Sequence, residues 1–354
     1  MRKTIEDLSL DIPVFQAPMA GTSTPALAAA VANAGGLGAL GLGAASVETA
    51  AKMIAETAAM TGGPINLNFF CHKPMELREE VARDWIARSK SRFERFEAAP
   101  PNELHEIYQS FVVNQAMFEL LLESAPAVAS FHFGLPAEDK LAALRDRGIM
   151  LIASAVSLED ARRVEAAGID AVVAQGWSAG GHRGLIDENG PDERLDTEAL
   201  TRLLAKNLSI PVIAAGGLMD GADVRASLSW GAEAAQLGTA FIGCPETAAD
   251  DGFRARLAEG GKTVMTRAIS GRPARCLDNE FTKWTADVSD AEVPAYPYTY
   301  DLGKALNAAA KAKGEPGYGA QWAGSEASRA RFLPAAKLMQ ALKEEFEAAD
   351  ADVA

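Results

Sequence analysis

Short apolar runs recur along the chain, and longer amphipathic segments separate them. The runs are rich in Val, Ile, Leu and Ala and do not alternate strictly with polar residues, which is typical of parallel strands covered on both faces. Strands that alternate with helices indicate βα units. The sequence therefore predicts eight strands, at residues 14–20, 37–42, 65–70, 128–133, 150–156, 171–175, 212–215 and 235–242.

The segments between these runs carry helix start and stop signals. Thr24 is a candidate N-cap, Pro25 suits the first helical position, and Gly35 ends the segment. Ser157 precedes a second amphipathic run that Gly168 ends. Eight βα steps in sequence favour a closed α/β structure, the (β/α)8 TIM barrel, over an open doubly wound sheet.

Two stretches exceed what a barrel needs. Residues 71–126 form a helical insertion after the third strand, and residues 244–354 form a C-terminal helical extension that ends in an acidic amphipathic helix near 334–349. Both begin at the carboxyl end of a strand, where barrel enzymes build their active sites, so we expect them to act as lids. The predicted organisation is a barrel over residues 1–243, with the C-terminal region packed on it.

Composition narrows the class of protein. The chain has 354 residues, 48% of them hydrophobic, which suits one barrel of roughly 250 residues plus an addition. A formal net charge of −14 disfavours nucleic acid and anionic membranes as partners. No run is long and apolar enough to span a bilayer, and the first residues lack the apolar core of a signal peptide. Three widely spaced cysteines fit a reducing compartment, so a cytoplasmic protein is expected.

The strongest local signal lies at the ends of the seventh and eighth strands. Gly216 and Gly217 end one strand, and the segment from Gln236 to Thr239 ends the next. In barrels these two loops and a helix N-terminus commonly bind phosphate, because glycine lets backbone N–H groups approach the anion. Glycines that only relieve crowding in tight turns are the alternative. Two such loops at the correct two strands favour a phosphate site.

The second signal is a histidine in a glycine-rich loop after the sixth strand. His182 is flanked by Gly180, Gly181 and Gly184, so little side-chain mass is available to bury it. A neutral imidazole there can take a proton near pH 7 or hold positive charge beside a reduced cofactor. The alternative is a surface-loop histidine without a function.

The first and third strands supply a third signal. The segment from Pro18 to Ala20 forms a rigid turn whose backbone can lie against a flat ring. Asn66 and Asn68 point to the same side of their strand, since side chains alternate. Asn68 offers a donor and an acceptor to a heteroaromatic edge, whereas we expect Asn66 to be satisfied by the neighbouring strand.

The remaining histidines give weaker signals. His132 ends the fourth strand and either lines the pocket or is a satisfied core histidine. For His72, just past the third strand, a role in the site and a structural role are equally supported, and we expect His105 to face water. Four scattered histidines without an HxH or HxxxH pair predict that no metal is bound.

Together these segments resemble the nitronate monooxygenase family, formerly called 2-nitropropane dioxygenases. The match runs in order from QAPMAG through PINLNFFCHKP and AQGWSAGGHRG to IPVIAAGGLMDGADV and AAQLGTAF, and covers most of residues 13–243. The later SGRPARCLDNEF is also similar. The chain departs from the family at Ser178, where the pattern QGxEAGGH has an acidic residue, so a carboxylate near the loop is missing.

The resemblance implies an FMN-dependent enzyme with a TIM-barrel core, and it assigns roles to particular residues. His182 matches the catalytic histidine, and Tyr296, Tyr298 and Lys304, with His132, are candidates for the substrate pocket. The expected contacts of FMN are Pro18, Met19, Ala20, Asn68, Gln175, Gly180, Gly181, Gly216, Gly217, Gln236, Leu237, Gly238 and Thr239. Of these, Gln175 and Asn68 are expected to hold the ring edge.

The resemblance also implies a reaction. A nitronate such as propionate 3-nitronate, the substrate that the FCHKP segment suggests, gives one electron to FMN. The anionic semiquinone that results reacts on with dioxygen, the carbon becomes a carbonyl, and the nitrogen leaves as nitrite or nitrate. His182 stabilises the flavin's negative charge and takes the α-proton of neutral nitroalkanes.

Two rival functions belong to different classes. An NAD(P)H-dependent FMN reductase of quinones or enoyl thioesters would use a similar barrel with the same loops. A non-catalytic flavin or phosphate binder is the other rival, and His182 argues against it. The sequence leaves the oligomeric state open.

Overall fold

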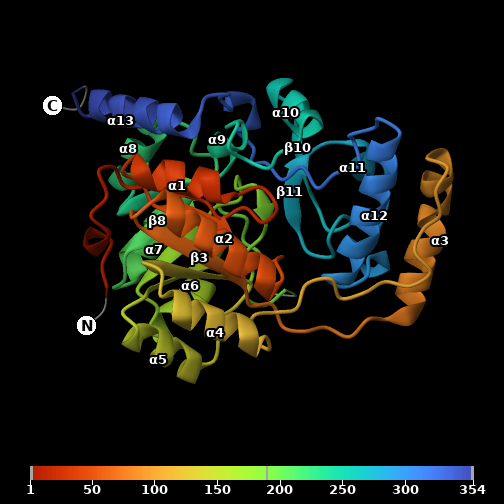
Figure 1. Cartoon of the computed structure of the whole chain (residues 1–354), viewed down its shortest axis with the longest axis horizontal. Coiled ribbons are helices and arrows are strands. Elements are labelled where there is room, and N and C mark those ends of the chain that lie inside the picture. The colour runs from red at the N-terminus through yellow and green to blue at the C-terminus, as the bar shows by residue number, and fades with distance from the viewer. Residues whose placement is uncertain (1–2, 189, 352–354) are drawn as a thin grey trace.

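The computed structural model describes residues 3–188 and 190–351, and its centre is a barrel of eight parallel strands (Figure 1). The strands follow one another in the sheet in the order β1-β9-β8-β6-β5-β4-β3-β2. The prediction of a (β/α)8 barrel is confirmed. The strands are β1 (Val14–Gln16), β2 (Gly38–Gly41), β3 (Ile65–Phe70), β4 (Val128–His132), β5 (Met150–Ala155), β6 (Ala171–Gln175), β8 (Val212–Ala215) and β9 (Ala234–Leu237).

The barrel closes between β1 and β2 with the help of a side chain. Phe15 forms a parallel bridge with Leu37, directly before β2. The fully buried Gln16 donates from Nε2 to the carbonyl oxygen of Ala39 at 3.0 Å and accepts from the N–H of Ala39 at 3.0 Å. The amide therefore occupies both backbone groups of Ala39, as a neighbouring strand would.

Two strands end several residues earlier than the sequence predicts, and β2, β4 and β5 end one residue earlier. β1 ends at Gln16 rather than at residue 20, and Pro18, which has no N–H for a sheet, lies in the loop that follows. β9 ends at Leu237, and Thr239–Ile242 form the short helix α9, so the prediction of a strand through residue 242 is wrong. Both segments thereby leave the sheet at the edge of the barrel, after the N–H of Ala17 donates to the carbonyl oxygen of Leu237 at 2.8 Å.

Helices cover the outside of the barrel, and their predicted caps are present. Thr24 accepts the N–H of Leu27 at 3.1 Å, and Ser157 accepts that of Asp160 at 3.1 Å. The covering helices are α1 (Pro25–Asn33), α2 (Val47–Met60), α4 (Gln115–Ser124), α5 (Glu138–Asp146), α6 (Leu158–Ala166), α7 (Thr197–Asn207) and α8 (Gly221–Ser229). No helix in the described ranges is long and apolar enough to cross a bilayer.

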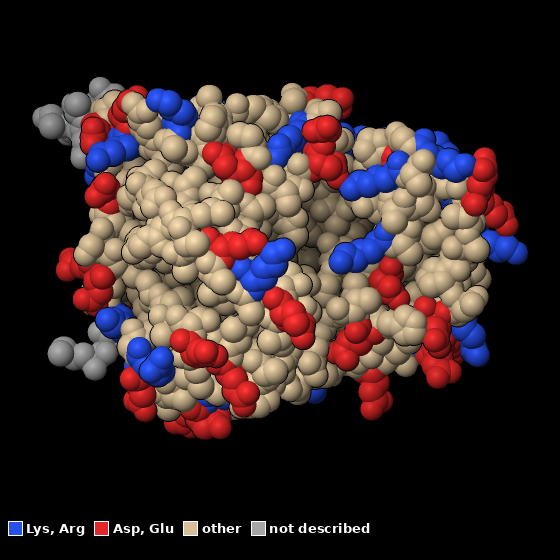
Figure 2. Space-filling view, in the orientation of Figure 1, with Lys and Arg blue, Asp and Glu red and all other residues tan. Residues whose placement is uncertain are grey.

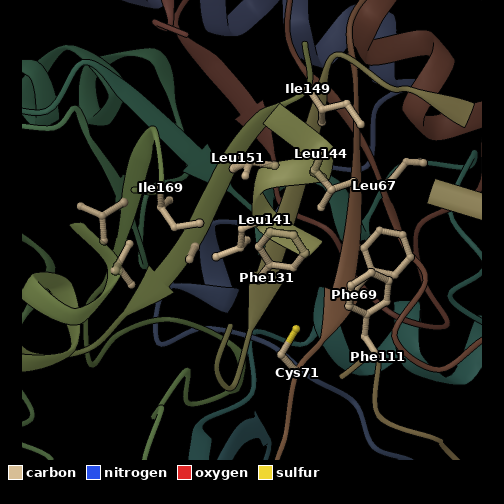
Figure 3. Packing of buried hydrophobic residues seen from close by; sticks show 14 of the residues in the cluster. Leu67, Phe69, Cys71, Phe111, Phe131, Leu141, Leu144, Ile149, Leu151 and Ile169 are labelled. Carbon is tan, nitrogen blue, oxygen red and sulfur yellow. The ribbon is translucent and has the colours of Figure 1, made fainter. Parts of the chain in front are cut away.

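Two layers of apolar side chains stabilise the barrel. Phe15, Met150 and Ile152 belong to a cluster contributed by alternating strand positions. A second cluster lies under the helices, where the rings of Phe69 and Phe111 approach to 4.6 Å between centroids (Figure 3). Burial of the apolar surface of these two clusters is the main contribution to the stability of the fold.

The insertion and the C-terminal region meet beside the barrel. The helix α3 (Glu79–Arg95) packs against α12 (Tyr298–Ala312), and their shared core includes Trp85 and Leu302. The C-terminal region also holds strands, which the expected helical extension did not include. β10 (Thr263–Thr266) and β11 (Ala274–Leu277) form an antiparallel sheet with β7 (Gly181–His182), while α10 (Asp251–Ala258) and α11 (Glu280–Trp284) are short helices of the same region.

The last helix does not cover the carboxyl ends of the barrel strands. α13 (Ala335–Ala351) packs against α8 and α1 on the outside of the barrel (Figure 1). A Cβ at Gly221 would lie 2.2 Å from the carbonyl oxygen of Leu342, so glycine permits this close approach. The expectation of a lid therefore does not apply to α13.

Candidate active site

A cavity of about 570 Å³ opens at the carboxyl ends of the barrel strands. Ala153, Val173 and Ala215 line it from the strands, and Tyr300 and Lys304 line it from α12. Figure 2 shows the surface hollowed between the barrel and the C-terminal region. The cavity therefore lies between two parts of the chain that are far apart in sequence.

Most of the residues that the sequence nominates come together here. They come from six of the barrel strands or the loops that follow them, and from α12, as expected for barrel enzymes. Those that line the cavity are Pro18, Met19, Ala20, Asn68, His132, Gln175, Gly180, Gly181, His182, Gly216, Gly217, Gln236, Gly238, Thr239 and Lys304.

Three nominated residues lie outside the lining. Leu237 points away from Gln236 because side chains alternate along β9, and it is buried in the outer core. Tyr298 packs in the cluster shared by α3 and α12. Tyr296 is buried beside His182, with ring centroids 5.7 Å apart, and its hydroxyl has no hydrogen-bond partner.

His182 is positioned by two sheets. It belongs to β7, whose register pairs His182 with Ala274 of β11. Gln175, at the end of β6, donates from Nε2 to the carbonyl oxygen of His182 at 2.9 Å and accepts from the N–H of Gly184 at 2.8 Å. The Gln175 amide thus holds the histidine loop, rather than only the ring edge of a cofactor as expected from the resemblance.

The ring of His182 has one polar partner. Its Nε2 lies 2.9 Å from the hydroxyl oxygen of Ser270, which is completely buried. The Ser270 hydroxyl donates to the carbonyl oxygen of Arg272 at 3.2 Å. Because a hydroxyl has one proton, this bond leaves the Ser270 oxygen to accept a hydrogen bond from the N–H at Nε2. The other ring nitrogen, Nδ1, has no partner among the described residues.

Burial and nearby cations keep the histidines of the site neutral. Desolvation, followed by the charges of His132, Arg272 and His72, lowers the pKa of His182 to about 3. Desolvation also lowers the pKa of His132 to about 4 and that of His72 to about 4. Arg272 is itself buried, with its guanidinium 4.3 Å from the ring centroid of Phe133.

His132 combines the two alternatives that the sequence leaves open. It lines the cavity, and both of its ring nitrogens have partners. Nε2 lies 3.2 Å from the carbonyl oxygen of His182, and Nδ1 lies 2.9 Å from the Ser154 hydroxyl. A carbonyl oxygen can only accept, so Nε2 carries the proton of His132. His132 therefore holds the backbone of the loop that carries His182, by donating to the carbonyl oxygen of His182.

The two asparagines of β3 differ from each other. Asn68 donates from Nδ2 to the Ser130 hydroxyl at 2.9 Å, and its Oδ1 has no partner in the described chain, so this oxygen is available at the cavity wall. Asn66 is buried with neither Nδ2 nor Oδ1 paired. The expectation that the neighbouring strand satisfies Asn66 is wrong, because the strand ladder already uses the backbone groups there.

Glycines bring four segments of backbone together at one end of the cavity. A Cβ at Gly180 would lie 2.5 Å from the N–H nitrogen of Gly324, and a Cβ at Gly238 would lie 3.3 Å from Cβ of Ala17. The backbone N–H groups of Gly217 and Thr239 have no acceptor among the described residues. Unpaired N–H groups in a glycine-lined concavity suit a phosphate group, so the residues present fit the expected FMN phosphate.

α12 contributes Tyr300 and Lys304 to the wall of the cavity. The ammonium of Lys304 lies 4.9 Å from the ring centroid of Tyr108 and 5.7 Å from that of Tyr300. Desolvation lowers the pKa of Lys304, and Asp301 opposes this effect. The sequence nominates Tyr296 and Tyr298 but not Tyr300. Spacing of four residues places Tyr300 on the same helix face as Lys304, and that signal could have identified it.

The sequence does not single out two further residues that contact His182. Ser270 is buried outside the cavity lining and lies against Nε2 of His182, and Trp322 lines the cavity with its ring centroid 5.0 Å from that of His182. His72 is buried with both ring nitrogens unpaired, and His105 is largely exposed, as expected. No group of three or more metal-binding side chains occurs among the described residues.

The family model and the sequence relatives agree on one family. The family model described as nitronate monooxygenase matches residues 2–345. The chain is 55% identical to a nitronate monooxygenase of Paraburkholderia phytofirmans, covering 96% of this chain and 93% of that protein. It is 46% identical to a nitronate monooxygenase of Pseudomonas aeruginosa, covering 96% and 97%. Among solved structures, nitroalkane oxidase from Streptomyces ansochromogenes is similar, with a TM-score of 0.90, 35% identity, and coverage of 99% and 100%.

Proposed function

Since the chain belongs to the nitronate monooxygenase family and is an oxidoreductase, we propose that it oxidises alkyl nitronates with FMN and dioxygen. The products are a carbonyl compound and nitrite or nitrate. The observation that carries the proposal is the position of His182, whose ring lines the same cavity as the unpaired N–H groups of Gly217 and Thr239. A group able to handle a proton and a site able to hold a flavin phosphate thus face one space.

The residues that would hold the cofactor come from separate segments of the cavity lining. Gly217 and Thr239 would donate backbone N–H groups to the phosphate. The backbone from Pro18 to Ala20 would lie along the flavin ring, and Asn68 Oδ1 would accept from a ring N–H. When bound, FMN supplies the electron transfer between the nitronate and dioxygen, a one-electron route in the family.

His182 has a defined role in this scheme. Its Nε2 donates to Ser270, so Nδ1 holds the free lone pair. For a neutral nitroalkane, Nδ1 would take the α-proton. A nitronate has already lost that proton and needs no base. For the nitronate, the ring would serve instead as a polar group beside the developing charge.

The cavity wall supports an anionic substrate. Lys304 brings a positive charge to the wall, and its ammonium lies near the rings of Tyr108 and Tyr300, with no ion pair to a carboxylate among the described residues. A nitronate that also carries a carboxylate, such as propionate 3-nitronate, would place that group near Lys304. This arrangement favours propionate 3-nitronate over an unsubstituted alkyl nitronate.

Anaerobic mixing tests the proposal. Purified protein is mixed with propionate 3-nitronate or, separately, with NADH, while the flavin absorbance is followed. We expect the nitronate to change the flavin spectrum rapidly and NADH to leave it unchanged over the same time. Rapid bleaching by NADH alone would instead support the reductase, and acid-released FAD in place of FMN would contradict the cofactor assignment.

A further inference from the structure

Two hydroxyl groups next to the glycine segments form a chain with a fixed direction. Ser178 Oγ lies 2.8 Å from Thr197 Oγ1, and the Thr197 hydroxyl donates to the carbonyl oxygen of Gly216 at 2.8 Å. A carbonyl oxygen can only accept, and each hydroxyl has one proton. Ser178 must therefore donate to Thr197, which donates to Gly216. We call Ser178 and Thr197 the hydroxyl relay.

The hydroxyl relay acts on one peptide plane. In a trans peptide the N–H points opposite to the preceding C=O, so fixing the carbonyl of Gly216 also fixes the N–H of Gly217. Thr197 is buried and does not line the cavity, whereas Gly217 does. The carbonyl thus points to the protein interior and the unpaired N–H of Gly217 points to the cavity.

The peptide between Gly216 and Gly217 is flexible unless a hydrogen bond of this kind fixes its orientation. Gly216 has φ +122° and Gly217 has φ +73°, values that glycine adopts freely, and a peptide between two glycines can rotate at little steric cost. The space for Thr197 is also made by glycine. A Cβ at Gly176 would lie 2.3 Å from Thr197 Oγ1, and one at Gly216 would lie 2.9 Å from it.

We propose that Ser178 and Thr197 are positioning residues for the cofactor: they orient the Gly216–Gly217 peptide so that the Gly217 N–H is presented to the FMN phosphate. This inference rests on the proposed function, because it requires FMN at this site. It also gives Ser178 a function of its own at the position where the family pattern has an acidic residue. A carboxylate that is ionised cannot donate to Thr197.

Comparison of two flavins tests the relay. Riboflavin has the same ring as FMN but no phosphate, so it does not use the Gly217 N–H. The apoprotein is titrated with each flavin, with quenching of flavin fluorescence as the readout. In Thr197→Val, which removes the hydroxyl but keeps the shape, we expect FMN affinity to fall about 5- to 10-fold and riboflavin affinity to change less than about 2-fold.

Three further variants complete the test. Thr197→Ser restores the hydroxyl and should bind both flavins like the parent, while Ser178→Ala should weaken FMN binding about 2- to 5-fold. Thr201 lies on the same helix, buried with an unpaired hydroxyl, so Thr201→Val is the matched control and should change neither affinity.

The outcomes separate the relay from the proposed function. Equal losses of FMN and riboflavin in Thr197→Val, or no loss of FMN, would overturn the relay while leaving the cofactor assignment in place. A parent apoprotein that binds FMN no more tightly than riboflavin would overturn the phosphate site itself. Should Thr197→Val fail to fold, Ser178→Ala decides the question alone.

Discussion

The Nε2 atom of His182 lies 2.9 Å from the hydroxyl oxygen of Ser270, although the two residues are 88 positions apart in the chain. Ser270 is held in turn by its bond to the carbonyl oxygen of Arg272. The pair fixes which ring nitrogen of His182 carries the proton. It also connects the barrel loop to the C-terminal region through Nε2, the ring nitrogen opposite the Nδ1 atom that would take the proton.

Removal of the Ser270 hydroxyl should affect substrates that need a base. In Ser270→Ala, His182 loses the acceptor that selects its tautomer, so kcat/KM for a neutral nitroalkane should fall about 3- to 10-fold, the value of one hydrogen bond. For a nitronate the change should stay within about 2-fold. Steady-state kinetics with both substrate forms, normalised to flavin content, measure this difference. Equal losses on both forms would contradict a role in tautomer selection.

Replacement of His182 itself should cause a larger difference between the activities on a nitronate and on a neutral nitroalkane. His182→Asn keeps a polar side chain but cannot accept a proton at neutral pH. It should retain FMN and most nitronate oxidation, and lose about 10²- to 10⁴-fold in kcat/KM for a neutral nitroalkane, provided that the parent turns one over. If both substrates lose activity equally, the histidine acts mainly as a neutral polar group beside the flavin and not as a base.

The buried histidines should make the protein less stable in acid. The pKa values of His72 and His132 are lowered to about 4 in the folded protein, against about 6.5 when unfolded. Between these values the unfolded chain binds more protons, so the free energy of unfolding falls as pH decreases below about 6.5. Each histidine should cost about 2 kcal/mol at pH 5 relative to neutral pH.

His72→Phe isolates one of these contributions. The ring nitrogens of His72 have no partners, and the residue does not line the cavity, so phenylalanine removes the titration without removing a hydrogen bond. Urea unfolding of the parent and the variant at pH 5 and pH 7.5 measures the change. The loss of stability between the two pH values should be smaller in the variant by about 2 kcal/mol. Identical losses would mean that His72 is protonated in the folded protein.

Gly217→Ala should weaken FMN binding through its backbone. Its φ of +73° is costly for any residue with a Cβ, and that Cβ would lie 3.1 Å from Oγ of Ser178. We expect a loss of affinity of about 10-fold or more, measured by titration of the apoprotein. Gly148→Ala is the control, since φ is +72° there and no atom lies within 4 Å of the added Cβ. It should lower stability but leave FMN affinity unchanged.

Lys304→Met should change the choice among nitronates. The ammonium is partly exposed, so its attraction to the carboxylate of propionate 3-nitronate should be modest, and KM should rise about 3- to 10-fold. KM for ethyl nitronate, which has no carboxylate, should stay within about 2-fold. Lys311→Met on the same helix is the control, because Lys311 pairs with Asp250 and does not line the cavity. Parallel changes for both nitronates would remove Lys304 from substrate recognition.

The sequence predicts the barrel because a hydrophobic run is visible wherever a strand is covered on both faces. It predicts the glycine loops and His182 because each lies within a few residues of a strand end. Closure by Gln16 is not predictable in this way, since one buried amide has no periodicity. Ser270 begins the family-like segment SGRPARCLDNEF, but its contact with His182 is not predictable, because the contact depends on a two-residue strand, β7, that is too short to give a pattern. On α12, spacing of four would have identified Tyr300 in place of Tyr298.

The pairing of β7 with β11 sets an order of events at the ribosome. All eight barrel strands precede residue 238, so they leave the exit tunnel before Ala274–Leu277 does. Domains generally begin to fold from the N-terminus during synthesis. A nascent barrel would therefore hold His182 on a loop without its sheet partner, and with Ser270 and Trp322 still to be made. The proposed flavin site is therefore complete only near the end of the protein's synthesis.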